Sequence, residues 1–317
     1  MDKHLLTEIE IKNFKCFEDF KADGFKRVNL IGGKNNVGKT AFMEACFVNV
    51  IAQDIKTFLN SLYAIKYMRE NLNILSGDKK NIKKYIEQSN NIYTKSNINL
   101  ALFKIEDAEG IKQYIFDFNK QYIKVNINAF SYEINDIDNI DFIDNFGLSN
   151  GEIISNYSTI QKKKDEAFLN NVLNKFDKRI KSFNVIDKKP LCEIEGQFYE
   201  ITEFGDGVRH LISIVTALYK CENGYLFIDE VDNGIHYTEL DEIWTIILEV
   251  SKKLNVQVFA TTHSKECIDS FNRMQKEGKD SSYFEMIKNI KTDKLFMRTL
   301  DDNQLNYELT HNGEFRG

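Results

Sequence analysis

The sequence has little proline, no paired cysteines and no long apolar run. The single proline, Pro190, reflects a composition bias that we attribute to the genome and not to function. No apolar stretch approaches the roughly 18 residues of a membrane helix, and the charged first residues do not resemble a signal peptide. We therefore expect a cytoplasmic protein without a membrane partner. The cysteines form no CxxC pair, which argues against a zinc site or a disulfide framework and predicts reduced, mostly buried thiols at Cys16, Cys46, Cys192, Cys221 and Cys267.

An excess of positive charge is also missing. The net charge of −6 argues against a surface coated with basic residues for non-specific nucleic-acid binding, although a local basic patch stays open. Hydrophobic residues make up 42% of the chain and charged residues 28%, as in soluble globular proteins with a substantial core. At 317 residues the chain only slightly exceeds the usual limit for one core, so we expect one large domain or a core with an insertion.

Hydrophobic periodicity predicts an α/β fold. Helical spacing of apolar residues predicts helices that begin at Thr40 and that cover residues 208–219 and 239–250. Strands that alternate with such helices imply a mainly parallel sheet. Short apolar or alternating runs predict the strands at residues 5–14, 27–31, 198–201, 225–228 and 256–260.

Residues 60–185 depart from this pattern and are expected to form an inserted helical and β region. A lysine-rich helical stretch is followed by alternating strands in residues 98–127 and by an Asn/Asp/Ile-rich segment through Tyr157. An amphipathic helix is expected over residues 165–183, because apolar residues recur on one face. No heptad run is long enough for an extended coiled coil.

A glycine-rich loop lies between the strand predicted at residues 27–31 and the helix that begins at Thr40. Glycines let backbone N–H groups and the positive helix end face phosphate oxygens, Lys39 should reach the outer phosphates, and Thr40 should offer its hydroxyl to Mg²⁺. Asn36 stands where many such loops have glycine, and asparagine tolerates a left-handed backbone. A chance Gly-Lys-Thr in a glycine-rich turn is the alternative. The loop fits the pattern G-x-x-x-x-G-K-[ST] without a mismatch, and with Ala41 after it the expected ATP-binding residues are Gly33, Lys34, Asn35, Asn36, Val37, Gly38, Lys39 and Thr40.

Two carboxylates, Asp229 and Glu230, follow the apolar strand predicted at residues 225–228. Parallel sheets bind their ligands at such strand ends. We expect Asp229 to hold the Mg²⁺ shell and Glu230 to orient or deprotonate the attacking water. Alone, the pair fits a solvated acidic turn equally well, but together with the phosphate loop it predicts ATP hydrolysis.

The opening residues Ile9 to Phe17 resemble the first strand of RecF, SMC and OLD-family ATPases, which begin with the pattern I-x-N-F-[KR]-x-[FY]. The resemblance implies an ABC-type P-loop ATPase head with antiparallel N-terminal strands. In that group a signature turn caps the nucleotide of the opposite subunit, and residues 204–209 resemble the OLD-like version of this turn. A glycine replaces the serine of the transporter type, so backbone N–H groups and Arg209 would do more of the work at the γ-phosphate. The implied nucleotide contacts are Gly205, Asp206 and Gly207.

Two further segments resemble motifs of the same group. Residues 232–236 resemble its D-loop, and residues 261–264 resemble its switch, in which His263 would hydrogen-bond the γ-phosphate and help sense hydrolysis. Alone, a histidine at a strand end is more often structural. The resemblance covers residues 5–55 and 190–317, so we assign residues 1–59 and 186–317 to the ATPase core. The closing residues 312–316 also resemble small stand-alone ATPases of this group, and we expect the chain to be nearly complete.

Other patterns are interpreted as coincidence. Residues 174–177 spell N-K-x-D, the guanine-binding motif of GTPases, but lie within the expected amphipathic helix, so we predict ATP and not GTP. Lysines at 162–164 and 188–189 are interpreted as solvated faces. No TOPRIM nuclease domain is expected. The sequence does not select between Gln113 and Gln121 as the glutamine of the Q-loop. Four aspartates without the glycine and glutamate of an EF-hand are interpreted as a solvated loop: Asp136, Asp138, Asp141 and Asp144.

These motifs favour an ATP-binding and hydrolysing molecular switch. Two heads would close face to face on two ATP–Mg²⁺ units, as a homodimer or within a higher homo-oligomer, and hydrolysis would reopen them. Closure would control DNA or a separately encoded effector such as a nuclease or toxin, by analogy with phage defence systems built on OLD-like ATPases. The alternative is a RecF-like repair ATPase that binds duplex DNA in an ATP-dependent, salt-sensitive way. An ABC transporter ATPase fits poorly, because the opening strand, the signature and the D-loop all differ.

Overall fold

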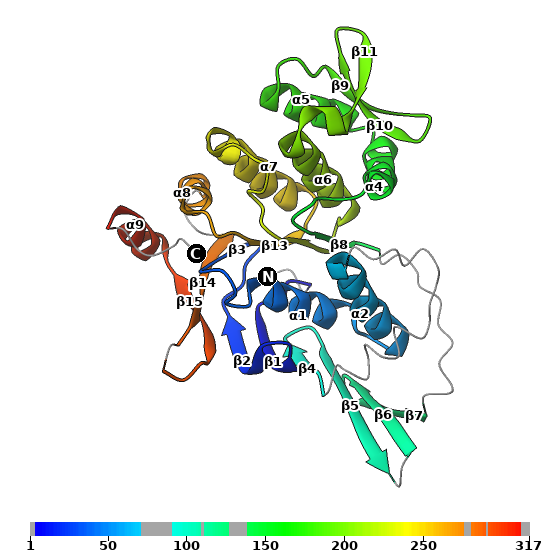
Figure 1. The fold of residues 1–317 in the computed structure, drawn as a ribbon, viewed down its shortest axis with the longest axis vertical. Coiled ribbons are helices and arrows are strands. Elements are labelled where there is room, and N and C mark those ends of the chain that lie inside the picture. Colours follow the sequence, from blue (N-terminus) through cyan, green and yellow to red (C-terminus); the bar gives the residue numbers. More distant parts are fainter. Residues whose placement is uncertain are drawn as a thin grey trace. The chain divides into compact units, whose positions relative to one another are not determined.

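The computed structural model describes residues 4–70, 91–108, 111–126, 138–275, 280–289 and 291–311. The chain forms two compact units, which are described separately (Figure 1). The first comprises Met1–Phe25, Asn36–Asp136 and Met286–Arg298, and the second comprises Lys26–Asn35, Ile137–Glu285 and Thr299–Gly317. The chain passes from one unit to the other within the glycine-rich loop and again within its last two strands.

The first unit contains an antiparallel sheet and the helices α1 (Lys39–Ile51) and α2 (Ile55–Glu70). Helix α1 packs against α2 and against strands β1 and β4 of the sheet. Large aromatic side chains fill this core, and the ring of Phe58 on α2 contacts three phenylalanines of the sheet. The strand order is β2-β1-β4-β5-β6-β7, with β1 (Glu8–Phe14), β2 (Phe17–Asp23), β4 (Tyr93–Ser96), β5 (Leu100–Ala108), β6 (Ile111–Phe118) and β7 (Gln121–Asn126).

The second unit is built on a mainly parallel sheet with the strand order β15-β14-β3-β13-β12-β8. From β14 to β8 every neighbouring pair is parallel. Every residue of β3, β12 and β13 is buried, as expected for central strands covered on both faces. The predicted α/β class, with antiparallel N-terminal strands, is thereby confirmed. The strands are β3 (Val28–Gly32), β8 (Ile140–Ile143), β12 (Tyr225–Ile228), β13 (Gln257–Thr261), β14 (Ser281–Lys288) and β15 (Leu295–Leu300).

Helices cover this sheet, and a small antiparallel sheet of β9 (Ser182–Ile186), β10 (Lys189–Ile194) and β11 (Gln197–Glu200) precedes α6 (Figure 1). Helix α6 packs on β8 and β12, and α7 and α8 pack on β3. Within the described ranges no helix is long and apolar enough to cross a membrane. The helices are α4 (Asn150–Lys163), α5 (Glu166–Phe176), α6 (Asp206–Lys220), α7 (Leu240–Lys253), α8 (Lys265–Met274) and α9 (Asp302–Thr310), with single 3₁₀ turns at Ile201–Phe204 and Tyr237–Glu239.

The helix expected over residues 165–183 ends at Phe176, and this part of the prediction was wrong. The Asp177 carboxylate accepts hydrogen bonds from the backbone N–H and the guanidinium of Arg179, which favours a turn. The Asn174 side chain donates to the carbonyl oxygen of Ile180 at 2.9 Å. Ile180 and Phe183 are buried as expected, but they lie in the turn and in β9 and not on the helix.

In the aspartate-rich segment, Asp138 lies in an exposed turn as expected, but the residues that follow it do not form a solvated loop. Residues 140–143 form β8, which pairs in parallel with β12 at the edge of the sheet. Asp141 is buried there, accepts a hydrogen bond from Asn156 at 2.9 Å and lies 3.5 Å from the ammonium of Lys220. Burial raises the pKa of Asp141, and Lys220 opposes that effect. Asp136, most of the lysine-rich stretch and residues 312–316 lie outside the described residues.

Candidate active site

The phosphate loop begins at the carboxyl end of β3, in the second unit. A Cβ on Gly32 would overlap the hydroxyl end of the buried Tyr283 ring, so a larger residue where β3 ends would have to displace that ring. The next residue, Gly33, has a φ of 129°, a conformation that residues with side chains rarely adopt. These glycines let the backbone leave the sheet in a sharp turn.

The rest of the loop leads into α1, in the first unit. Asn36 and Gly38 have φ values of 61° and 88°, so both are left-handed, a conformation that asparagine and glycine tolerate. A Cβ on Gly38 would lie 2.8 Å from the sulfur of Cys16, which leaves no room for a side chain. Helix α1 begins at Lys39, with no side-chain cap and no acidic residue in a first turn that also holds Thr40. Such a helix start presents N–H groups and a positive pole to an anion.

Asp229 and Glu230 follow β12 at the carboxyl edge of the parallel sheet, next to the end of β13. The last residue of β13, Thr261, is fully buried, and its hydroxyl donates to Oδ1 of Asp229 at 2.6 Å. The same hydroxyl accepts a hydrogen bond from the backbone N–H of Glu230 at 3.0 Å. The carbonyl oxygen of Thr261 accepts from the N–H of Val231, also at 3.0 Å. One residue of β13 therefore holds the turn that carries both carboxylates.

Glu230 has a φ of 54°, which is left-handed and rare for a residue with a side chain. Such a conformation costs roughly 1–3 kcal/mol, so the surrounding contacts must hold it. Its carbonyl oxygen accepts from the N–H of Asn233 at 2.9 Å, so hydrogen bonds hold the residue from both sides. The turn directs a part-exposed Glu230 carboxylate to where His263 follows β13.

The Nδ1 atom of His263 lies 3.5 Å from Oε1 of Glu230. This nitrogen is buried and makes no hydrogen bond to the part of the chain that the structure describes. The structure thus brings Asp229, Glu230 and His263 together, because two parallel strands end side by side.

Thr262 connects the D-loop to the same edge. Its hydroxyl donates to Oδ1 of Asp232 at 2.6 Å and accepts from the backbone N–H of Ser264 at 3.0 Å. Sequence reasoning assigned roles to neither Thr261 nor Thr262. The available signal was two hydroxyl side chains at the end of a strand expected beside Asp229.

A further carboxylate, Asp144, lies half-buried after β8 at this edge of the sheet. It accepts a hydrogen bond from the backbone N–H of Phe146 at 2.8 Å. Burial raises the pKa of Asp144, and the negative charges of Glu152 and Asp229 add to the rise. Sequence analysis had placed this residue in a solvated loop.

The signature turn packs against the D-loop of the same unit. Gly205 has a φ of 81°, and the space around its Cβ position is open. A Cβ on Gly207, by contrast, would lie 2.7 Å from the carbonyl oxygen of Gly234. Helix α6 begins at Asp206, and the guanidinium of Arg209 donates to the carbonyl oxygen of Leu148 at 2.8 Å. Arg209 is therefore engaged within its own chain.

The oxygen donors of these motifs suit a hard cation such as Mg²⁺. Asp229 keeps one carboxylate oxygen against the Thr261 hydroxyl, which fixes the plane of its carboxylate. Thr40 supplies a hydroxyl in the first turn of α1. Thr40 lies in the first unit and Asp229 in the second.

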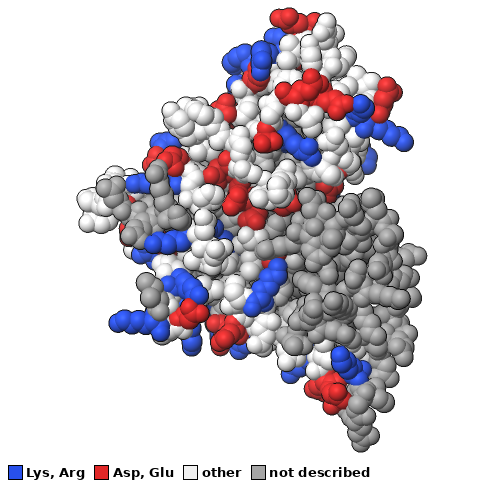
Figure 2. All heavy atoms as spheres, viewed as in Figure 1, with Lys and Arg blue, Asp and Glu red and all other residues white. Residues whose placement is uncertain are grey.

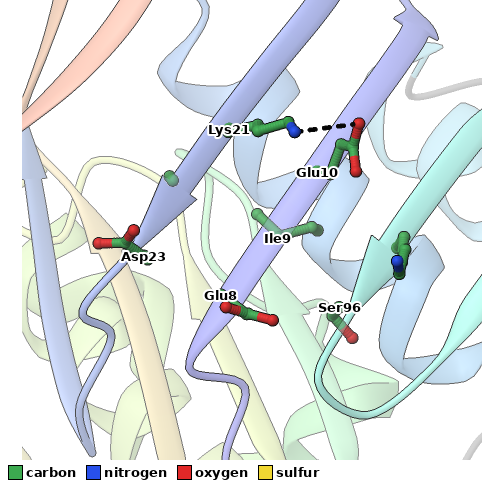
Figure 3. A pocket seen from close by; sticks show the side chains of 8 residues that line it. Glu8, Ile9, Glu10, Lys21, Asp23 and Ser96 are labelled. Atoms are coloured by element: carbon green, nitrogen blue, oxygen red, sulfur yellow. Dashed lines mark ion pairs between the residues drawn. The ribbon is translucent and has the colours of Figure 1, made fainter.

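A pocket on the antiparallel sheet of the first unit is lined by other residues, among them Glu8, Glu10 and Lys21 (Figure 3). Glu10 lies 3.5 Å from the ammonium of Lys21 and 2.9 Å from that of Lys12. The hydrogen bond from Lys12 is the main cause that lowers the pKa of Glu10. Because these charges compensate one another, we assign no ligand to this pocket.

Comparison with known proteins agrees with the motifs. A family model described as "AAA domain, putative AbiEii toxin, Type IV TA system" matches residues 124–269, which contain α6, Asp229, Glu230 and His263 but not the phosphate loop. An ATP/GTP phosphatase of Helicobacter pylori is 25% identical over 332 residues, covering 86% of this chain and 89% of that protein. An uncharacterized protein of Methanocaldococcus jannaschii is 39% identical over 67 residues, covering 20% of this chain and 57% of that protein.

Among solved structures, the SmcHead bound to the C-winged helix domain of ScpA is similar with a TM-score of 0.55. The two chains are 13% identical, and the match covers 94% of this chain and 98% of that chain. At this identity the similarity concerns the fold. Together with the matched family model and the phosphatase relative, it supports the resemblance stated from the sequence: the chain has the fold of an ABC-type ATPase head like that of SMC proteins.

Proposed function

We propose that this protein is an ATP-hydrolysing molecular switch that dimerises on ATP and controls a partner effector. The observation that carries the proposal is the group at the ends of β12 and β13, where Glu230 is held in a left-handed turn beside Asp229 and faces His263. A carboxylate fixed in this way suits a general base for water.

Each predicted residue has a role in this proposal. The N–H groups of residues 33–41 cradle the phosphates, and Lys39 binds the outer ones. Thr40 and Asp229 would hold Mg²⁺, which would supply positive charge against the phosphate oxygens. Glu230 takes a proton from the attacking water, and His263 donates a hydrogen bond to the γ-phosphate. The buried Nδ1 of His263 faces Glu230, so we assign the phosphate contact to Nε2.

The signature turn supports a role for a second copy of the chain. Gly205 opens onto free space, and α6 starts directly after it without a side-chain cap. Its first N–H groups can therefore donate hydrogen bonds to an anion that arrives from outside. In the proposed dimer Gly205, Asp206 and Gly207 contact the nucleotide bound by the partner copy. The D-loop packs directly on Gly207 of this turn.

We place effector control ahead of the DNA-repair alternative because of charge. In the second unit, lysines of the candidate basic clusters pair with carboxylates, Lys163 with Glu222 at 2.8 Å and Lys189 with Glu200 at 2.6 Å. On the face of that unit drawn in Figure 2, basic and acidic side chains are interspersed. Such a surface lacks the one-signed field that steers DNA.

The printed descriptions of the related proteins point in the same direction. The matched family model describes its own AAA domain as a putative AbiEii toxin of a type IV toxin–antitoxin system, and the similar SmcHead is bound to a domain of another protein. We therefore propose a separately encoded protein effector, such as a toxin or nuclease, and a role in defence against phage.

The first test is the solution mass of Glu230→Gln by light scattering, with and without ATP and Mg²⁺. Because this variant keeps the turn but loses the base, we expect ATP to produce or tighten a dimer. Lys39→Ala, which loses the phosphate contact, is the control and should show no such change. A Glu230→Gln protein that binds ATP and stays monomeric would contradict the paired-head mechanism. DNA binding that requires ATP and weakens steeply with salt would favour the repair alternative.

A further inference from the structure

Thr261 makes an unusual set of contacts for a buried threonine. Its hydroxyl donates to Oδ1 of Asp229 at 2.6 Å and accepts from the N–H of Glu230 at 3.0 Å, so both its donor and an acceptor position serve the two acidic residues. Thr216, which is equally buried on α6, instead bonds to the carbonyl oxygens of Ile212 and Ser213 in its own helix. The hydroxyl of Thr261 is thus directed at the site and not at its own strand.

The two hydrogen bonds act on different properties of the site. The bond to Asp229 restricts the rotation of its carboxylate about the last side-chain torsion. The bond from Glu230 holds the backbone of a left-handed residue, and the direction of the Glu230 side chain depends on that backbone.

We propose that Thr261 is a positioning residue, whose hydroxyl orients Asp229 toward Mg²⁺ and Glu230 toward the attacking water. The proposal rests on the ATPase function proposed above. Because β13 also leads directly to His263, the strand end sets three groups at once: the metal ligand, the base and the γ-phosphate contact.

Thr261→Val tests the hydroxyl while keeping the shape of the side chain. It leaves Oδ1 of Asp229 and the N–H of Glu230 without this partner. At saturating ATP and Mg²⁺ we expect kcat to fall about 10–100-fold, as for other residues that orient metal ligands. The KM for ATP should change little, because the phosphate loop is untouched. Thr261→Ser keeps the hydroxyl and should restore most of the rate.

A second measurement needs no hydrolysis. In the Glu230→Gln background, which keeps the backbone N–H of residue 230, a fluorescent ATP analogue is titrated with Mg²⁺. Thr261→Val should raise the Mg²⁺ concentration for half-maximal binding about 10–100-fold, and Thr261→Ser should not. Thr216→Val is the matched control for the loss of a buried hydroxyl, and it should change neither Mg²⁺ dependence nor kcat.

Three results would overturn the proposal. Thr261→Val could match the wild type, or Thr216→Val could show the same loss, or Thr261→Ser could fail as badly as Thr261→Val, which would make the methyl group responsible. If Thr261→Val does not fold, as judged by thermal unfolding, Thr261→Ala and Thr261→Ser take its place in both measurements. Wild-type protein that binds ATP but does not hydrolyse it would refute the proposed function, while the Mg²⁺ titration would still decide the role of Thr261.

Discussion

The backbones of Gly207 and Gly234 are in direct contact, one at the start of α6 and the other in the D-loop. A Cβ on Gly207 would lie 2.7 Å from the carbonyl oxygen of Gly234, and a Cβ on Gly234 would lie 3.2 Å from the backbone nitrogen of Gly207. Two glycines in contact let the signature turn and the D-loop touch through their backbones. There is accordingly no space for a side chain between the two segments.

Gly207→Ala should destabilise the protein by about 1–3 kcal/mol, because the added methyl group has no space. The measurement is the free energy of unfolding in denaturant. Gly151→Ala is the matched control: Gly151 is also the second residue of its helix, α4, but nothing lies within 4 Å of its Cβ position. The control should gain about 0.4–1 kcal/mol. Equal effects at both positions would contradict the close contact.

The Glu230→Gly variant should be more stable toward unfolding than the Glu230→Ala variant. Glu230 has a φ of 54°, and a left-handed residue with a side chain carries a penalty of about 1–2 kcal/mol that glycine avoids. We expect the free energy of unfolding of Glu230→Gly to exceed that of Glu230→Ala by about 1 kcal/mol, although both should lose ATP hydrolysis. The order should reverse at Glu249, an exposed position within α7, where alanine is favoured by about 1 kcal/mol. An alanine advantage at both positions would show that residue 230 is not left-handed in solution.

The two partners of the ion pair between Lys15 and Glu44 should contribute unequally to the free energy of unfolding. Glu44 is buried on α1 with 2% of its side chain exposed, whereas Lys15, in the turn between β1 and β2, is 29% exposed. Lys15→Ala leaves a buried carboxylate and should lower the free energy of unfolding by about 3 kcal/mol. Glu44→Ala should cost less, because the ammonium can turn toward water.

Lys12→Ala is the comparison for that experiment, since Lys12 pairs with Glu10 at the surface and should contribute less than about 1 kcal/mol. Chemical denaturation of all three variants provides the ranking. A larger loss for Glu44→Ala than for Lys15→Ala would mean that packing of the Glu44 side chain, and not its charge, stabilises this end of α1.

Local chemistry explains what the sequence could predict. Residues 225–228 form β12 as expected, because a short run of apolar residues that ends at two carboxylates is typical of a buried strand. Asn36 and Gly38 are left-handed where the loop pattern requires it. These features depend on neighbours in the sequence and on general backbone rules.

The features that could not be predicted from the sequence depend on pairing between segments that are distant along the chain. Strand β8 has only four residues, and it is a strand because its backbone pairs with β12. One of the four is Asp141, whose buried carboxylate is stabilised by Asn156 and Lys220. Thr261 likewise acquires its contacts because β13 ends level with β12. Neither relationship leaves a periodic signal in a single sequence.

The last prediction concerns pH and the buried histidine of α6. His210 is 3% exposed, and burial lowers its pKa from 6.5 to about 4. The unfolded chain therefore takes up a proton near pH 6.5, whereas the folded protein does so only near pH 4. Stability from this group is complete above pH 6.5 and is lost as the pH falls toward 4, by about 3 kcal/mol at most.

His210→Gln removes the titrating ring, so its free energy of unfolding should fall less between pH 7 and pH 4 than that of the wild type. Denaturant unfolding at several pH values measures the difference. Thr216→Val, on the same helix, removes a buried polar group that does not titrate and should keep the wild-type slope with pH. If His210→Gln keeps that slope as well, the ring must be reached by solvent in the folded protein, because a shielded imidazole cannot accept a proton at the same pH as an unfolded one. That result would contradict the burial of His210 on α6.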